Sequence, residues 1–251
     1  MSIEKTASVI LSVLPYRESS FITNLFTSEY GRISGIAKGI RRNTKQSVPF
    51  ERGFLIEHII YVKPNRELQI LADIRIGNFF PSIRGNLEKT ALRDIAFEIL
   101  LSSVTLSGPH PELFELLSRF LFSLDEAREI SEEQFSILWK FIFDFTAMMG
   151  FGVDFGRCFK CDSKDIPSHG GFLMPQKGAM ICRKCAPQFS PSGWLPSEIV
   201  SYLSNGLFSS GPSRISFPEL LRLTRLAVHY CRFHLDIRKE LKSLGFLQQM
   251  G

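Results

Sequence analysis

Hydrophobic and polar residues alternate in short runs along the first eighty positions of the chain. The runs at residues 8–14, 21–27, 32–38, 54–62 and 68–75 are rich in β-branched and aromatic residues, and turn formers or charged residues separate most of them. Five short strands in so short a stretch predict a small closed barrel. The five-stranded OB fold is the natural candidate, because closure removes the exposed edges of a sheet. We therefore expect residues 1–80 to form an OB-fold domain.

Helical periodicity replaces this alternation after residue 80. Asn86 can cap a helix that runs to about residue 105, and a second helix is expected to begin at Pro111. Capping boxes, in which a serine and a residue three positions later satisfy the first backbone N–H groups, are predicted at Ser131 with Gln134 and at Ser216 with Glu219. Residues 81–251 are thus expected to form a mostly helical domain.

Four cysteines interrupt the helical pattern. Cys158 and Cys161 form one C-x2-C pair, Cys182 and Cys185 form another, and the twenty residues between the pairs fall in the range of structural zinc sites. Each two-residue gap closes a tight turn that aims two thiolates at one ion, and four sulfurs can surround zinc as a tetrahedron. With four cysteine ligands no position stays open for water, so the predicted zinc is structural. The fold class is therefore α+β, with a zinc finger at about residues 155–190 inserted in the helical domain.

Other uses of four cysteines fit the sequence less well. Two disulfides would require an oxidising compartment, and a redox C-x-x-C normally occurs as one pair beside a βαβ unit, while four thiolates can also hold an iron–sulfur cluster. His169 lies in the turn-rich segment between the pairs, where we expect it to be solvated. The fifth cysteine, Cys231, lies in an apolar helical stretch and is expected in the core.

The charge of the chain permits a polyanionic partner. The net charge is +5, and between residues 32 and 52 only Glu51 opposes a cluster of basic residues. This cluster consists of Arg32, Lys38, Arg41, Arg42, Lys45 and Arg52. OB barrels bind single strands across one sheet face and its bordering loops, so we expect these cations to contact DNA phosphates. A solvated loop that aids solubility is the alternative.

Catalytic signatures and targeting segments are not found in the sequence. The segment from Gly35 to Gly39 lacks the spacing of a phosphate-binding loop, H-E-x-x-H does not occur, and neither does the zinc-deaminase set. His229 and His234 are five residues apart and do not share a helix face as paired ligands would. The chain also has no apolar run of about 18 residues and no export signal. We expect a cytoplasmic, nucleoid-associated protein that is not an enzyme and does not contact a membrane.

Several segments, in order, resemble the bacterial DNA repair protein RecO family. Tyr16-Arg17-Glu18-Ser19-Ser20 is similar to the family's turn after the first strand. Thr27 with Gly31-Arg32, and then Ala37-Lys38-Gly39-Ile40-Arg41-Arg42, is similar to its next conserved segment. The cysteines lie where many members carry a zinc finger. The tail, His234-Leu235 and Leu241-Lys242-Ser243, resembles the closing motif, although Arg238-Lys239-Glu240 replaces the usual Arg-Pro.

The resemblance implies a non-enzymatic mediator of recombinational repair. Such proteins bind single- and double-stranded DNA, anneal complementary strands without ATP, and help load RecA together with RecR and often RecF. They also bind the acidic, apolar C-terminal tail of single-strand-binding protein. That ligand requires an apolar pocket with cations at its rim, for which the helical segments offer Arg119, Arg128, Arg222 and Arg225.

Two other functions stay open on the sequence. One is a zinc-ribbon accessory factor in transcription or translation, in which the finger itself contacts nucleic acid. Six cations in and beside the finger make this conceivable: Arg157, Lys160, Lys164, Lys177, Arg183 and Lys184. The other is a metal-dependent nucleic-acid enzyme, in which activity, and not the fold, would depend on zinc.

Overall fold

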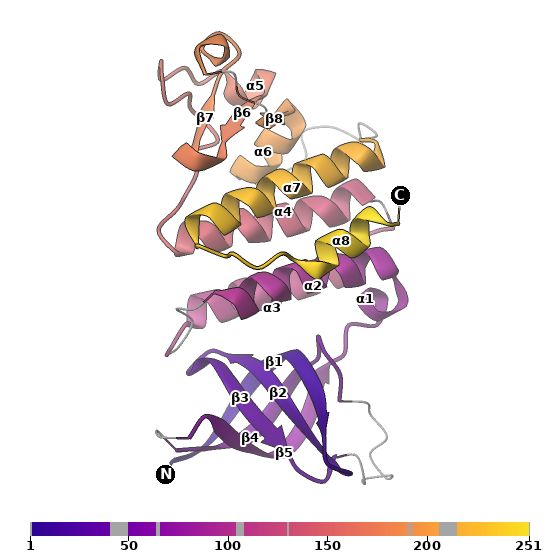
Figure 1. Ribbon diagram of the computed structural model, residues 1–251. Coiled ribbons are helices and arrows are strands. Elements are labelled where there is room, and N and C mark those ends of the chain that lie inside the picture. Colours follow the sequence, from indigo (N-terminus) through magenta and orange to yellow (C-terminus); the bar gives the residue numbers. More distant parts are fainter. Residues whose placement is uncertain are drawn as a thin grey trace. The chain divides into compact units, whose positions relative to one another are not determined.

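The computed structural model (Figure 1) describes residues 2–40, 50–63, 66–103, 108–129, 131–189, 191, 193–205 and 215–250. The chain divides into two compact units. The first unit comprises Met1–Leu87 and Ser103–Asp125, and the second comprises Glu88–Ser102 and Glu126–Gly251. Each unit therefore combines two stretches of chain that are separate in the sequence.

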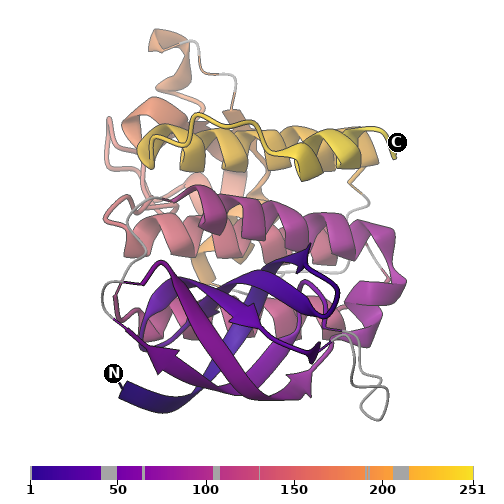
Figure 2. The same cartoon turned by 60° about the horizontal axis from the view of Figure 1, so that its bottom comes forward.

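The first unit contains a closed five-stranded barrel. Its strands are β1 (Ser2–Tyr16), β2 (Ser20–Thr27), β3 (Gly31–Ala37), β4 (Leu55–Val62) and β5 (Leu68–Asn78). They pair in the order β1-β2-β3-β5-β4, and β4 returns to β1. The β3–β5 pairing is parallel, whereas the other pairings are antiparallel. Figure 2 shows these strands in indigo to purple, wrapped around one another. The OB-like barrel predicted from the alternating pattern is confirmed.

Inward-facing side chains of alternate strand positions fill the barrel. Ile10, Leu25, Ile56, Ile60 and Leu71 are all buried and belong to one hydrophobic cluster. Successive side chains of a strand point to opposite faces, so a period of two places one set of residues in the core. This period is the physical basis of the pattern seen in the sequence.

His58 is a polar exception inside the barrel. It lies on β4 between Ile56 and Ile60 and is only 1% exposed. Its Nε2 atom lies 2.7 Å from the hydroxyl oxygen of Ser8. Burial lowers the pKa of His58, while the backbone of Ile59 and the charge of Glu29 act in the opposite direction. The neutral imidazole is therefore the form that the folded barrel favours.

The stability of the barrel is expected to fall in mild acid because of His58. Its folded pKa lies below the usual histidine value of 6.5, so below that pH the unfolded chain binds more protons and the free energy of unfolding decreases as the pH falls. One group contributes at most about 1.4 kcal/mol per pH unit. Thermal unfolding at several pH values between about 7.5 and 5.5 measures this slope. His58→Gln, which does not titrate there, should flatten it; an unchanged slope would assign the effect to other groups.

Two helices accompany the barrel in the first unit. They are α1 (Pro81–Gly85) and α3 (Pro111–Glu126). α3 is amphipathic and buries Leu113, Leu117 and Phe120 among others. The backbone N–H groups of Gly108 and His110 donate to the carbonyls of Tyr30 and Ser28, and these bonds tie the start of α3 to the β2–β3 turn. The helix predicted from Pro111 is present, and it belongs to the unit that contains the barrel.

The second unit is helical. Its helices are α2 (Leu87–Ser102), α4 (Ser131–Met148), α6 (Ser197–Asn205), α7 (Phe217–His234) and α8 (Lys242–Gln248). α4 and α7 pack against each other, and the indole N–H of buried Trp139 donates to the hydroxyl of Thr224 at 2.9 Å. Cys231 on α7 is fully buried, as its apolar surroundings predicted. Among the described helices, none combines the length and apolar character needed to cross a bilayer.

The predicted capping boxes are wrong, although both helices begin close to the expected positions. Ser131 is already the first residue of α4, and its hydroxyl donates to Glu88. Ser216 is the N-cap of α7 but makes no side-chain capping bond, and Glu219 pairs with Arg222 instead. Tertiary and helix-surface partners take these side chains, which local pattern cannot anticipate.

The finger is a small β-rich module in the second unit. It contains α5 (Ile166–His169), β6 (Gly171–Met174), η2 (Pro175–Lys177), β7 (Ala179–Ile181), η3 (Ala186–Gln188) and β8 (Gly193–Leu195). The strands form one sheet in the order β7-β6-β8. No long helix lies between the two cysteine pairs, as the prolines and glycines of this segment predicted.

Candidate metal centre and nucleic-acid interface

Two tight turns carry the four cysteines. In the first turn the backbone N–H of Asp162 donates to the carbonyl of Cys158 at 2.8 Å. In the second, which directly follows β7, the N–H of Cys185 donates to the carbonyl of Cys182 at 3.1 Å. Both C-x2-C pairs thus form the turns that their spacing predicted.

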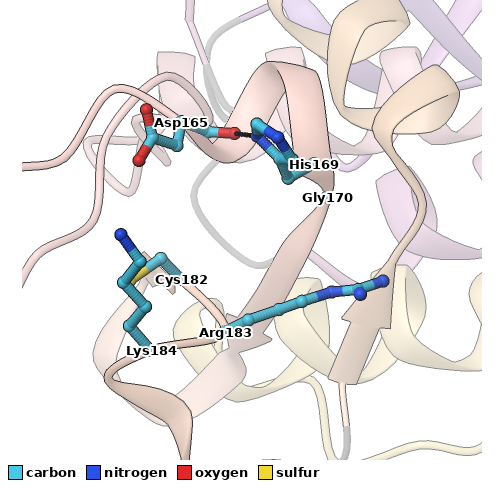
Figure 3. A pocket seen from close by; sticks show the side chains of 6 residues that line it. All are labelled: Asp165, His169, Gly170, Cys182, Arg183 and Lys184. Carbon is cyan, nitrogen blue, oxygen red and sulfur yellow. Dashed lines mark hydrogen bonds between the residues drawn. The ribbon is translucent and has the colours of Figure 1, made fainter.

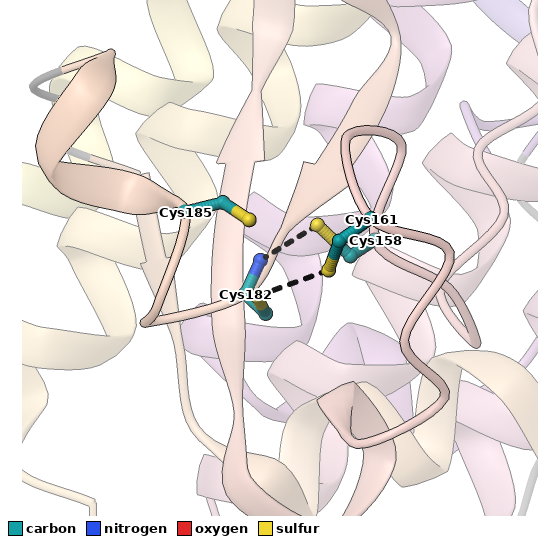
Figure 4. Close-up of side chains that lie close together, drawn as sticks. All are labelled: Cys158, Cys161, Cys182 and Cys185. Atoms are coloured by element: carbon teal, nitrogen blue, oxygen red, sulfur yellow. Dashed lines mark hydrogen bonds between the residues drawn. The ribbon is translucent and has the colours of Figure 1, made fainter.

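The four sulfur atoms converge on one point. They all lie within 4.8 Å of one another, and the Sγ atoms of Cys161 and Cys182 are 3.8 Å apart (Figure 4). A tetrahedral zinc with Zn–S bonds of about 2.3 Å requires sulfur–sulfur edges of about 3.8 Å. A disulfide requires about 2.05 Å, and all four cysteines are free thiols. The donor set therefore fits one tetrahedral, sulfur-seeking ion.

The thiols have unequal pKa values. Desolvation raises the pKa of Cys158, but backbone N–H donors of Cys182, Cys161 and Lys160 outweigh it and lower the pKa to about 6. Desolvation and the neighbouring cysteines raise the pKa of Cys185 to about 12. Four close thiolates disfavour one another unless a cation lies among them. A dication at the centre would supply the charge that this cluster requires.

His169 stands apart from the sulfurs. It is exposed on α5, and its Nδ1 atom lies 3.2 Å from the carbonyl oxygen of Asp165. In the described part of the chain, the candidate metal cluster consists of the four cysteines. The exposure of His169 agrees with the solvated loop histidine expected from the sequence.

The basic residues proposed for DNA lie near β3 and β4 where the structure describes them. Arg32 is half-buried on β3, Lys38 is exposed directly after β3, and Arg52 is half-buried before β4. Arg41, Arg42 and Lys45 lie outside the described residues. Glu51, the one acid of this segment, forms an ion pair with Arg84 at 3.0 Å. Its carboxylate is thus already shared with another cation.

The four arginines proposed for a protein partner have different surroundings. Arg119 is exposed on α3, and Arg225 is exposed on α7. Arg128 pairs with Glu133 at 2.9 Å. Arg222 donates to both carboxylate oxygens of Glu219 and to the backbone oxygen of Trp194. Arg119 belongs to the first unit and the other three to the second.

The structure also brings together residues of the finger that are distant in sequence. The guanidinium of Arg183 lies 4.3 Å from the ring centroid of Trp194. The ammonium of Lys177 lies 5.2 Å and 5.3 Å from the ring centroids of Phe159 and Phe189. The sequence shows these cations, but only the folded finger brings their aromatic partners beside them.

Two models of one protein family match the chain along nearly its whole length. The family model described as "Recombination protein O N terminal" matches residues 1–80, and "Recombination protein O C terminal" matches residues 84–244. A "DNA repair protein RecO" of Geobacter metallireducens is 26% identical and covers 100% of this chain and 99% of the relative. A protein of the same name from Pelobacter propionicus is 29% identical, covering 99% of this chain and 97% of the relative.

Proposed function

Because the chain belongs to the RecO family of DNA repair proteins, we propose that it acts as a mediator of recombinational repair. In this proposal it binds single- and double-stranded DNA and anneals complementary strands without ATP. With RecR, and often RecF, it helps load RecA onto single-stranded DNA that single-strand-binding protein covers. The protein performs this role by binding and positioning, not as an enzyme.

The observation that carries the proposal is the closed barrel that coincides with the N-terminal family match. The strand order β1-β2-β3-β5-β4 is that of an OB-like barrel, and the match covers residues 1–80. OB barrels combine a charged groove for phosphates with a sheet face for bases. The basic residues at and between β3 and β4 would supply the charge: Arg32, Lys38, Arg41, Arg42, Lys45 and Arg52.

The metal would have a structural role. Cys158, Cys161, Cys182 and Cys185 would hold one zinc ion, whose chemistry when bound is to crosslink the two turns. The finger sheet has only short strands, β6, β7 and β8. So small a sheet buries little apolar surface, and a crosslink stabilises it by constraining both turns at once.

The acidic tail of single-strand-binding protein is the proposed protein ligand. Its terminal apolar side chain requires a pocket, and its carboxylate requires a cation at the rim. The exposed guanidinium groups of Arg119 and Arg225 are accessible to such a ligand. Arg128 and Arg222 would have to exchange or share their present glutamate partners. The proposal therefore rests more on the first pair than on the second.

Replacing both Arg41 and Arg42 by alanine is expected to weaken DNA binding irrespective of base sequence. Each lost phosphate contact on a single strand reduces the slope of log affinity against log salt by about 0.7, so the pair should reduce it by about 1.4. Fluorescence anisotropy with a labelled oligonucleotide at several salt concentrations measures both quantities.

The matched control removes two other cations of the barrel. Lys5 and Arg75 are exposed, and each pairs with an acid, Glu57 at 2.8 Å and Asp73 at 3.4 Å. Lys5→Ala with Arg75→Ala changes the total charge by the same amount and should leave affinity and slope almost unaltered. Equal behaviour of the two double variants would show that bulk charge, and not a site near Arg41, governs binding.

A zinc-ribbon accessory factor is the second candidate function. The exposed cations of the finger favour it, because they would allow the finger alone to bind nucleic acid. In that case the Arg41 and Arg42 double variant would bind DNA as the unaltered protein does. The same titration therefore separates the two candidates.

A further inference from the structure

We propose that the zinc finger carries a second surface for single-stranded DNA, in which a base stacks at Arg183 and Trp194. We call this pair, with the groove beside it, the Arg183–Trp194 platform. The inference rests on the proposed function in assuming that the protein binds DNA. It assigns to the finger a role beyond that of a metal-stabilised module.

The finger surface carries unpaired positive charge. Five of its cations are exposed and form no ion pair within the described part of the chain: Lys160, Lys164, Lys177, Arg183 and Lys184. Arg157, in contrast, lies 3.4 Å from a carboxylate oxygen of Asp162. A dication held by four thiolates adds two negative charges, and the finger still stays net positive. Such a surface attracts a phosphate backbone.

The platform offers flat surfaces as well as charge. Arg183 stacks 4.3 Å from the centroid of the Trp194 ring, and Phe172 meets the same ring edge to face at 5.0 Å. A guanidinium that is stacked on one side keeps its other face for a base and its edge N–H groups for a phosphate. One side chain can therefore contact both parts of a nucleotide.

Two hollows adjoin Arg183. A groove of about 450 Å³ is lined by apolar side chains together with this arginine: Phe172, Ala186, Pro187, Pro191 and Trp194. A second pocket of about 210 Å³ is lined by Arg183, Lys184 and His169, and by Asp165, Gly170 and Cys182 (Figure 3). Figure 3 shows Arg183 and Lys184 leaving the chain in different directions. The apolar groove suits a base, and Arg183, which lines both hollows, borders it with charge.

A second cation–aromatic group extends the same chemistry. Lys177 lies over Phe159 and Phe189, and the Phe159 side chain is 43% exposed. Exposed aromatic rings alternating with unpaired cations are typical of surfaces that bind single strands, because every base has a face that can stack. We expect neighbouring nucleotides to contact this group.

Single-stranded DNA fits these features better than other polyanions do. A duplex hides the faces of its bases, so it would use the charge and leave the aromatic groove empty. An acidic peptide would also use the cations, but its carboxylates offer no flat ring for the Arg183 stack. The combination of groove, stack and charge therefore favours a single strand.

Two separate surfaces would suit strand annealing. The basic segment near β3 and β4 belongs to the first unit, and the platform belongs to the second. A protein that pairs two strands must hold both at once. Each unit would then contribute one strand-binding surface.

The fluorescence of Trp194 tests the inference directly. The chain has two tryptophans, and the other, Trp139, is buried at 2% exposure. In full-length Trp139→Phe protein, Trp194 is the sole tryptophan, and its emission can be excited selectively. Titration with an oligothymidylate should quench its emission to a saturable limit, because a base in the groove that Trp194 lines contacts the indole, and added salt should restore it. If Trp139→Phe does not fold, the difference between the unaltered protein and Trp194→Phe gives the same signal.

A pair of arginine variants within the finger supplies the control. Arg183→Ala should abolish the quenching and lower oligothymidylate affinity by about tenfold, because it removes both the stacked guanidinium and a phosphate contact. Arg157→Ala removes the same charge from the finger but leaves the platform intact, so quenching should persist. Zinc content and circular dichroism of both variants should match the unaltered protein.

Two results would overturn the inference. The first is that anisotropy shows oligothymidylate binding while the Trp194 emission stays constant. The proposed DNA site of the barrel would then stand without the platform. The other is equal quenching by an acidic peptide such as oligoglutamate, which would assign the surface to a protein ligand. Quenching that survives the Arg41 and Arg42 double variant with undiminished affinity would instead support the platform and contradict the barrel site.

Discussion

Replacing Cys182 by serine is expected to release the metal and unfold the finger. Cys182 is buried, its Sγ atom lies 3.8 Å from that of Cys161, and its backbone N–H donates to the sulfur of Cys158. A serine hydroxyl is neutral and a poor zinc ligand, so the remaining three thiolates would hold the ion weakly. Zinc contributes on the order of 10 kcal/mol to the folding of small finger peptides, so the local effect should be large.

The unfolding should be confined to the finger and its immediate neighbours. The helices α4 and α7 have a core of their own around Trp139, and the barrel has a separate cluster. Elemental analysis should find one zinc per chain in the unaltered protein and little in Cys182→Ser. Limited proteolysis should then cut the variant between residues 155 and 195, while the helical content by circular dichroism changes little.

Cys231→Ser is the matched control for this experiment. It makes the same chemical change at a buried cysteine of α7 that lies outside the sulfur cluster. It should cost stability through a buried hydroxyl but retain the zinc. Unaltered protein that is purified without any metal, or Cys182→Ser that keeps its zinc, would refute the assignment of these ligands.

The parts of the fold that depend on local pattern were predictable from the sequence. The barrel strands alternate with a period of two, and each pair of cysteines needs only its own turn to aim two sulfurs. The strands and the turns themselves therefore follow from local sequence. Closure of the barrel, in which β1 pairs with β4, and the meeting of the two cysteine turns also need segments that are distant in the sequence.

Features that depend on distant partners were not predictable. The hydroxyl of Ser131 donates to Glu88, 43 positions away, instead of capping its own helix. The helix α3 belongs to the unit that contains the barrel, although α2, which precedes it in the sequence, belongs to the other unit. No short-range pattern encodes either choice, because each is decided by what the folded chain brings nearby.

The Arg183–Trp194 platform depends on the same kind of long-range packing. Gly193, beside Trp194, is buried on β8, and a Cβ atom there would lie 2.3 Å from the carbonyl oxygen of Leu173. Only glycine permits this approach of β8 to β6, which sets the position of Trp194. The sequence shows a glycine before a tryptophan but not the strand that passes so close to it.

Strand annealing without a nucleotide tests the proposed mediator role most directly. Two complementary oligonucleotides, each coated with single-strand-binding protein and labelled as a donor–acceptor pair, report duplex formation by energy transfer. An OB-like barrel that binds strands by charge and stacking needs no hydrolysis, so the protein should accelerate annealing equally with and without ATP. The Arg41 and Arg42 double variant should be slower, and the Lys5 and Arg75 control should match the unaltered protein. No acceleration over the coated strands alone, or acceleration that requires ATP, would contradict the proposed function.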